Sequence, residues 1–309
     1  MAHTFHWSRW GQHLAIAAVY AACYELTLYF SFPQWLCTAG LRLACLLLLP
    51  VRFWPALVLG EGLPLLENAL LCAPRFGAPW AVAQAVPMVV LWMALLKPMR
   101  RRWSLYDARG DVRMSMILWA ALGTAMITAL STTVRLILAL QHTPGKWPDI
   151  VPADYFFAYL LGAYLGALTL TPLILALRER FRRLQGAPLT STVVWRSPLL
   201  RDTLCWVLPV LMALVWLAMA THHDGVRLAA QLALMVPVIG LAWRHGWHGT
   251  AVGGMVASVA LAITANDLLD PATLRVQVLL SLMLSIALWI GARALRRSPS
   301  LTAPASQER

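Results

Sequence analysis

Long apolar runs, separated by short polar or basic segments, fill almost the whole chain. The run 155–177 contains 23 residues and no charge. At about 1.5 Å per residue, an α-helix of this length crosses a hydrocarbon core of about 30 Å. Similar runs predict further spans at 13–31, 34–49, 53–72, 79–96, 114–140, 203–220, 227–243, 249–265 and 274–295. The sequence therefore predicts an all-α, polytopic integral membrane helix bundle with about ten transmembrane helices.

The runs 34–49 and 53–72 fit this interpretation least well. They are short and contain Arg42, Glu61, Pro64 and Glu67, and charged side chains are costly in a hydrocarbon phase. The alternative is an eight-helix bundle in which these two runs form a re-entrant pair. Both versions place the two termini on the same side of the membrane.

Composition supports the membrane interpretation. Of the 309 residues, 60% are hydrophobic and only 12% are charged, and the mean hydropathy is +0.67. The net charge is +12, but the basic side chains gather in 97–113, 178–201 and 293–297, between or after apolar runs. This arrangement indicates membrane topology and contact with the anionic headgroups of the lipid bilayer. We therefore expect no nucleic-acid partner.

The three basic segments also predict the orientation of the chain. In the ten-helix map, two spans separate the first segment from the second, and four separate the second from the third. All three therefore fall on one side, which we expect to be the cytoplasm, because cytoplasmic loops are rich in Lys and Arg. Both termini are then cytoplasmic, and the helices lie in a bacterial inner membrane. Residues 1–297 form one membrane domain, and 298–309, rich in Ser, Pro and Ala, form a disordered cytoplasmic tail.

Residues that usually carry catalysis or bind metals are sparse. The five cysteines fall within or beside apolar runs, and the two short histidine groups, at 222–223 and 245–248, offer too few ligands for a metal site. The sequence contains no nucleophile elbow and no phosphate-binding glycine loop. We therefore expect no enzyme activity, no metal and no cofactor.

The run 155–177 carries the residues of a helix-packing surface. Gly162 and Gly166 are four residues apart, and each is followed by an alanine, so the backbone of a neighbouring helix can approach closely on this face. Pro172 removes a backbone donor and tends to bend the helix. We expect this helix to pack inside the bundle.

Four charged residues lie inside apolar runs, namely Glu25, Arg42, Glu61 and Glu67. Isolated charges are costly there, so these side chains must find partners or water. The simplest arrangement pairs Arg42 with Glu25 or Glu61, and we hypothesise that this network binds a ligand or receives a signal. The structural alternative is an ion pair that only fixes helix register, or carboxylates that desolvation keeps protonated. Arg135 lies near the outer end of its run, where its long stem can reach the interface.

Three stretches resemble the first class of the bacterial membrane-associated sensor domains, abbreviated MASE. They are TAGLRLACLLLLPVRFWPALVLGE, LLGAYLGALTLTPLILALRER and VPVIGLAWRHGWHGTAVGGMVASVALAITA, and together they cover nearly the whole chain in the order that the class shows. The positions that match the class are Ala39, Gly40, Leu41, Arg52, Trp54, Pro55, Gly60, Gly162, Leu165, Gly166, Thr171, Pro172, Leu173, Pro237, Arg244, Gly246 and Gly249.

The resemblance implies a sensory function. Members of this class feed a cytoplasmic histidine kinase or a domain that makes or degrades cyclic diguanylate. The class has an acidic residue between the two glycines of the central stretch, and Ala163 stands there instead, so this chain cannot use that acid in sensing. Because no output domain is present within the 309 residues, we expect signalling to a separate partner.

We interpret the chain as an inner-membrane sensory or adaptor protein that detects a small ligand or a membrane state. It would signal to a cytoplasmic histidine kinase or cyclic-diguanylate enzyme. The alternative is a small secondary transporter in which the intramembrane carboxylates and Arg42 form a substrate or proton path, although no similarity between the two halves supports it. A scaffold for other membrane proteins is a third interpretation, and self-association into a homo-oligomer is compatible with each.

Overall fold

The computed structural model describes residues 3–32, 34–108, 110–142, 150–183, 197–221, 223–265 and 269–297. Within these ranges the chain is helical, with two isolated β-bridges and no strand. The predicted all-α class is therefore confirmed. The tail 298–309, which the sequence predicts to be disordered, lies outside the described residues.

The helices follow one another along the chain. Their bounds are α1 (His3–Tyr29), α2 (Cys37–Leu48), α3 (Trp54–Phe76), α4 (Ala78–Ala85), α5 (Met88–Arg102), α6 (Met114–His142), α7 (Pro152–Arg183), α9 (Pro198–Asp202), α10 (Leu208–Ala220), α11 (Asp224–Ala233), α12 (Met235–Thr264) and α13 (Pro271–Arg297). A 3₁₀ turn, Val51–Phe53, leads into α3. A π-helical turn, Thr203–Val207, joins α9 to α10.

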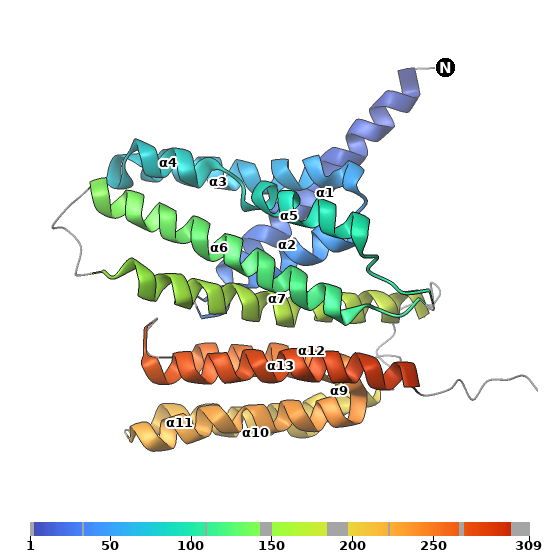
Figure 1. Ribbon diagram of the computed structural model, residues 1–309, viewed down its shortest axis with the longest axis vertical. Helices are drawn as coiled ribbons and strands as arrows, with labels where there is room; N and C mark the ends of the chain where they lie inside the picture. The colour runs from blue at the N-terminus through green and yellow to red at the C-terminus, as the bar shows by residue number, and fades with distance from the viewer. Residues whose placement is uncertain are drawn as a thin grey trace, which may run out of the picture.

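Helix α7 lies at the centre of the bundle. It contacts α2, α6, α12 and α13, and Figure 1 shows it between the layer of α3, α4 and α5 and the layer of α10 and α11. Helix α2 approaches α7 at two glycines. A Cβ on Gly40 would overlap the Gly166 carbonyl, and a Cβ on Gly166 would overlap the Leu36 carbonyl. The structure thus places another backbone on the face where the sequence predicts close packing.

In the described part of the chain, six helices are long and apolar enough to cross a membrane. A seventh crossing results if α4 and α5, which are bent by 44° at their junction, are counted as one span. Helix α2 has only 12 residues, about 18 Å, so by length it does not cross alone as expected for 34–49. The prediction of a polytopic bundle is confirmed, and the count of ten stays a prediction.

One of the six stretches, 224–264, folds back on itself at Gly246. The backbone there has φ 59° and ψ −142°, a conformation that glycine adopts without a Cβ clash. Gln231 donates a hydrogen bond to the Thr264 carbonyl at 3.3 Å across 33 residues, which would extend about 50 Å along a straight helix. The stretch therefore forms two antiparallel arms, 224–245 and 247–264.

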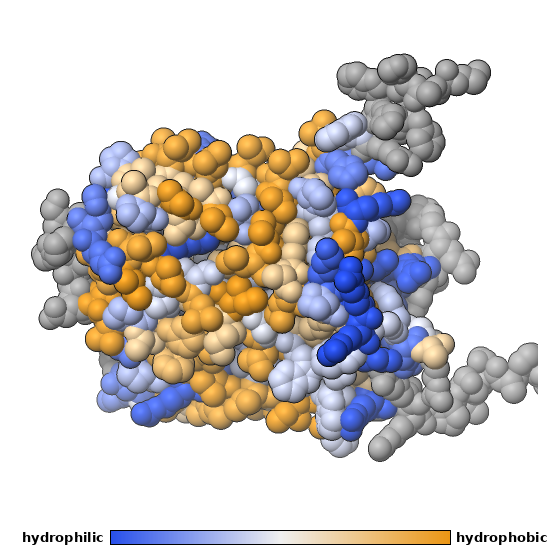
Figure 2. Space-filling view, turned by 45° about the horizontal axis from the view of Figure 1, so that its top comes forward, coloured by the Kyte–Doolittle hydropathy of each residue, from blue (hydrophilic) through white to orange (hydrophobic). Residues whose placement is uncertain are grey.

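The described parts of the three basic regions gather at one end of the bundle, where the end of α13 meets the turn at Gly246 through Gly291 and Trp247. Arg178 donates to the Tyr106 hydroxyl at 3.4 Å, and the His248 ring nitrogen lies 3.2 Å from a Glu179 oxygen. The segment after α5, the end of α7 and the turn at Gly246 are therefore neighbours. Figure 2 shows hydrophilic side chains at this end beside a broad hydrophobic belt, as a protein that crosses a bilayer requires.

Candidate functional site

A buried ion pair joins α2 to α3. The Arg42 Nε donates to Glu61 Oε2 at 2.8 Å, and Nη2 donates to Oε1 at 3.1 Å. The two residues are 4% and 0% exposed. This bidentate geometry is the strongest arrangement of a guanidinium with a carboxylate. Because either charge alone would be costly to bury, the pair holds the two helices in one register.

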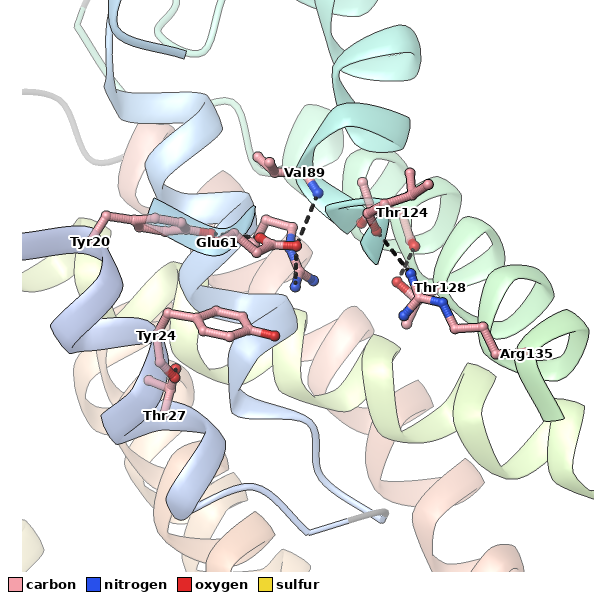
Figure 3. Close-up of polar contacts among 10 residues, drawn as sticks. Tyr20, Tyr24, Thr27, Glu61, Val89, Thr124, Thr128 and Arg135 are labelled. Carbon is pink, nitrogen blue, oxygen red and sulfur yellow. Dashed lines mark hydrogen bonds and ion pairs between the residues drawn. The ribbon is translucent and has the colours of Figure 1, made fainter. Parts of the chain in front are cut away.

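Two further donors reach the Glu61 carboxylate. The Tyr20 hydroxyl of α1 donates to Oε2 at 3.1 Å, and the Val89 backbone N–H donates to Oε1 at 3.2 Å (Figure 3). Val89 lies in the first turn of α5, where backbone N–H groups have no partner within the helix. A carboxylate is favoured at this positive end of the helix dipole. One side chain of α3 therefore links α1, α2 and α5.

Aromatic rings cover the guanidinium of the same pair. The Arg42 Cζ lies 4.8 Å from the centroid of the Trp92 ring on α5 and 5.9 Å from that of Tyr24 on α1. Cations are attracted to the faces of such rings, more strongly when water is excluded. We call the set Tyr20, Tyr24, Arg42, Glu61, Val89 and Trp92 the buried charge network.

The break between α4 and α5 is held by charges from two other helices. Pro87 has no N–H, so the Ala83 carbonyl loses the donor that a continuous helix would supply. Arg135 of α6 replaces it, since its Nε donates to Ala83 at 3.2 Å and its Nη2 to the Val86 carbonyl at 3.0 Å. A cation thus caps the negative end of α4, and Glu61 caps the positive end of α5.

The structure brings together two of the four charged residues predicted as a site. Arg42 pairs with Glu61, one of the two partners that the sequence offers. Glu25 and Glu67 are exposed on α1 and α3 and take no part in this pair. A ligand-binding role for any of the four stays a prediction.

Other members of the site were missed by sequence reasoning. Arg135 does not simply extend to the interface, because it donates to two backbone carbonyls at the helix break. Tyr20 and Trp92 lie in apolar runs, where an aromatic residue gives no sign of a polar contact. Val89 acts through its backbone, so its side chain carries no signal either. Only the missing N–H of Pro87 could have indicated an unsatisfied carbonyl at Ala83.

A second polar junction ties the segment before α2 to the later helices. The Trp35 Nε1 donates to the Thr169 hydroxyl of α7 at 3.0 Å, and Gln277 of α13 donates to the Gln34 carbonyl at 2.6 Å. All four residues are buried. Non-helical backbone is tolerated at membrane depth only where the protein or enclosed water satisfies its polar groups. The start of α2 is therefore fixed to both α7 and α13.

Histidine–carboxylate pairs occur at the basic end. Asp202 Oδ2 lies 2.9 Å from His245 Nε2 and accepts a hydrogen bond from Arg244 at 3.0 Å. Together with the contact between His248 and Glu179, they fix α9 and α7 to the turn at Gly246. Among the residues that the structure describes, no group of three or more His, Cys, Asp or Glu side chains could hold a metal ion.

Comparison with known proteins finds a family and a curated relative. The chain matches the MASE1 family over residues 12–296. It is also similar to the signal transduction histidine-protein kinase/phosphatase UhpB of Salmonella typhimurium (strain LT2), with 25% identity over 263 residues. The match covers 83% of this chain and 46% of the relative, so the chain spans about half the length of the curated relative it matches. No solved structure matches the chain.

Proposed function

Because the chain belongs to the MASE1 family of membrane sensor domains, we propose that it is an inner-membrane sensory protein that detects a small ligand or a membrane state. Its signal passes to a cytoplasmic histidine kinase or cyclic-diguanylate enzyme. The similarity to a protein named as a signal transduction histidine kinase/phosphatase supports this output. Both termini and the basic end of the bundle face the cytoplasm in this proposal, since basic segments are favoured there.

The buried charge network is the observation that carries the proposal. The Glu61 carboxylate accepts hydrogen bonds from α1, α2 and α5 at once. A change that draws it away from one donor leaves a buried group without its partner, so intermediate arrangements are unfavourable and two discrete packings are expected. A ligand shifts the balance between them when it binds one packing more tightly than the other.

Helix α13 is the route by which the change would reach the basic end. Gln277 holds its first half to the segment before α2. Its second half lies against the turn at Gly246, because a Cβ on Gly291 would be 2.5 Å from the Trp247 nitrogen. A shift of α2 therefore alters both the position of α13 and the surface that a cytoplasmic partner meets.

Deletion of the gene in its own bacterium is the first test. We expect it to change either the cellular level of cyclic diguanylate or the phosphorylation of a histidine kinase. Cross-linking in native membranes should recover the corresponding enzyme. If both signals stay unchanged and no such enzyme is recovered, the sensory proposal is wrong.

Substitution of the ion pair then assigns the response to the buried charge network. Glu61→Gln keeps the size of the side chain but removes its charge, and it should change the response that deletion identifies. Glu67→Gln is the matched control, because Glu67 lies on the same helix and is exposed. Equal membrane levels of both variants are required. If both variants give the same response, the buried charge network has no specific role in signalling.

Transport is a second candidate function, favoured by the broken helix. Discontinuous helices whose ends meet charged groups occur at the binding sites of secondary transporters, and α4 and α5 form such a pair beside Glu61 and Arg135. In proteoliposomes, a transporter would move protons or a charged solute, and Glu61→Gln would abolish this flux. Absence of flux across a panel of ion and proton gradients would reject this function.

A further inference from the structure

A cavity of about 320 Å³ lies between α1, α2 and α3, next to the buried charge network. Among its lining residues are Ala15, Val19 and Tyr20 of α1, Leu41 and Cys45 of α2, and Leu57 of α3. Tyr20 connects the two features, because its ring forms part of the cavity wall while its hydroxyl donates to Glu61 at 3.1 Å. Whatever fills the cavity therefore contacts the ring that positions this hydroxyl.

Exposed apolar side chains surround the mouth of the cavity. Ala15 and Val19 line it and are exposed, Val19 by 65%, and the neighbouring Leu14 is exposed by 62%. This part of α1 packs along α3, which is long and apolar enough to cross a membrane, so in a membrane its exposed face would meet lipid hydrocarbon. Water inside such an apolar space would lack the two to four polar partners that hold buried water. The occupant that the surroundings supply is an acyl chain.

A basic residue lies close in sequence to the cavity wall. Leu49 lines the cavity, and its carbonyl accepts a hydrogen bond from Arg100 at 2.8 Å. Arg52 follows three residues later in the 3₁₀ turn between α2 and α3. Arg52 is exposed. Within the described ranges it has no acidic partner, and its Cζ lies 4.7 Å from the Phe53 ring. Basic side chains at this depth attract anionic lipid headgroups.

We propose that this cavity binds one acyl chain of an anionic phospholipid whose headgroup contacts Arg52. The acyl chain gains little hydrophobic energy on binding, because it moves from one hydrocarbon environment to another. Shape and headgroup charge therefore give the selectivity. The proposal rests on the sensory function only in its consequence, namely that occupancy of the cavity biases the contact between Tyr20 and Glu61. Lipid binding itself is independent of that function.

Photo-cross-linking in lipid nanodiscs tests the binding. The full chain is reconstituted with phosphatidylglycerol that carries a diazirine on one acyl chain, and after irradiation the adducts are located by peptide mass spectrometry. We expect the α1 and α2 peptides that line the cavity to carry more adducts than the exposed face of α10. Labelling of these peptides by phosphatidylglycerol should exceed labelling by a phosphatidylcholine probe about fivefold. This factor is the preference for an anionic lipid that one basic side chain provides.

Filling variants show whether the adducts come from the cavity. Cys45→Phe and Ala15→Phe should each remove most of the excess, and two variants are used in case one of them fails to insert. Leu26→Phe is the matched control on α1, because Leu26 is 59% exposed and does not line the cavity. Arg52→Gln should abolish the preference for phosphatidylglycerol while the cavity stays intact.

Three results would overturn the proposal. Adducts spread evenly over all exposed faces and unchanged by the filling variants would indicate ordinary annular lipid. A cross-linked dimer with unlabelled cavity peptides would mean that a second copy occupies the site. Equal labelling by both lipids would refute the headgroup contact at Arg52.

The coupling to signalling is tested separately. Tyr20→Phe keeps the cavity wall but removes the hydrogen bond to Glu61, so lipid labelling should persist while the cellular response becomes insensitive to cavity filling. If the reconstituted protein shows the lipid excess but deletion of its gene changes no cellular signal, the sensory function alone is contradicted. Loss of the lipid excess with an intact cellular response would contradict the lipid site alone.

Discussion

Helices α1–α6 and helices α9–α13 differ in how the chain is interrupted within the bundle and in which polar groups hold it there. In the first group the chain is interrupted between α4 and α5, and the free helix ends are capped by Arg135 and Glu61. In the second group the chain reverses at Gly246. Its described residues contain no ion pair in which both partners are buried, and Gln231 and Gln277 supply uncharged contacts.

The difference separates two kinds of sensitivity. Charges that cap a broken helix respond to a ligand, a lipid or a proton, because each can compete for the same groups. Two arms that touch through glycines respond to shape alone. The proposed sensory function therefore assigns detection of a signal to the first group and its transmission to the second. Substitutions in the two groups should differ in how far they lower the free energy of unfolding. They should also differ in whether a second substitution, at a partner residue, reduces that loss.

The largest expected effect follows removal of one charge from the buried pair. Arg42→Ala leaves Glu61 buried without its cation, and breaking such a pair costs about 3–5 kcal/mol. Unfolding in mixed detergent micelles, followed by helical circular dichroism, measures the loss. The double variant Arg42→Met with Glu61→Leu removes both charges and should lose less than the single variant. An equal or greater loss in the double variant would contradict the view that pairing dominates in this region.

In the second group, Gly249→Ala should lower the free energy of unfolding by about 1–3 kcal/mol through a steric clash. The added Cβ would overlap the Leu241 carbonyl oxygen and lie 3.0 Å from the His245 Cβ. Gly225→Ala is the matched control in the same region, because nothing lies within 4 Å of its Cβ position. The same unfolding measurement applies. Equal stability of the two variants would show that close backbone approach does not hold the arms together.

A comparable loss, about 1–3 kcal/mol, is expected from Arg135→Ala, which leaves two carbonyls at the α4–α5 break without their donor. Pro87→Ala restores an N–H that can donate to the Ala83 carbonyl. In that background the effect of Arg135→Ala should fall by about 0.5 kcal/mol or more, which a double-mutant cycle measures. Strict additivity would mean that Arg135 does not replace the donor that Pro87 lacks.

The features that could be predicted from sequence belong to single segments. The central place of 155–177 follows from its apolar length and its two glycines, and the reversal near Gly246 follows from the short polar stretch between two apolar runs. The break at Pro87 could not be predicted in this way. Pro64, Pro98 and Pro172 also lie inside helices that remain continuous. What distinguishes Pro87 is the pair of charges that α3 and α6 bring to it.

The sequence limits the partner of Arg42 to Glu25 or Glu61 but does not decide between them. The decision depends on which face of α1 turns inward. Tyr20 and Tyr24, four residues apart, take the inward face of α1, which leaves Glu25 exposed. Helical periodicity shows which residues share a face. It does not show which of two apolar faces meets the protein and which meets lipid.

The smallest expected effect is at the start of α13, where a carboxylate caps a helix near the surface. Asp270 accepts hydrogen bonds from the Ala272 and Thr273 N–H groups at 3.2 Å and from the Thr273 hydroxyl at 2.6 Å. Partial burial raises the pKa of Asp270, but these hydrogen bonds and the positive charge of Arg227 together outweigh it, so the pKa lies below its usual value. The carboxylate therefore stabilises the fold above the unfolded-state pKa of about 3.9, and this contribution disappears as the pH falls through the lowered pKa.

Asp270→Ala should cost about 1 kcal/mol at neutral pH, and the difference from the unsubstituted chain should shrink below about pH 4. Asp270→Asn keeps a capping oxygen and should lose only part of this amount. Unfolding measured between pH 3 and pH 7 tests both expectations, and a difference that does not vary with pH would show that the charge plays no part. Asp270 and Glu61 cap their helices with the same chemical group. A much larger loss at Glu61 would therefore attribute the sensitivity of the first region to burial and to Arg42, rather than to capping itself.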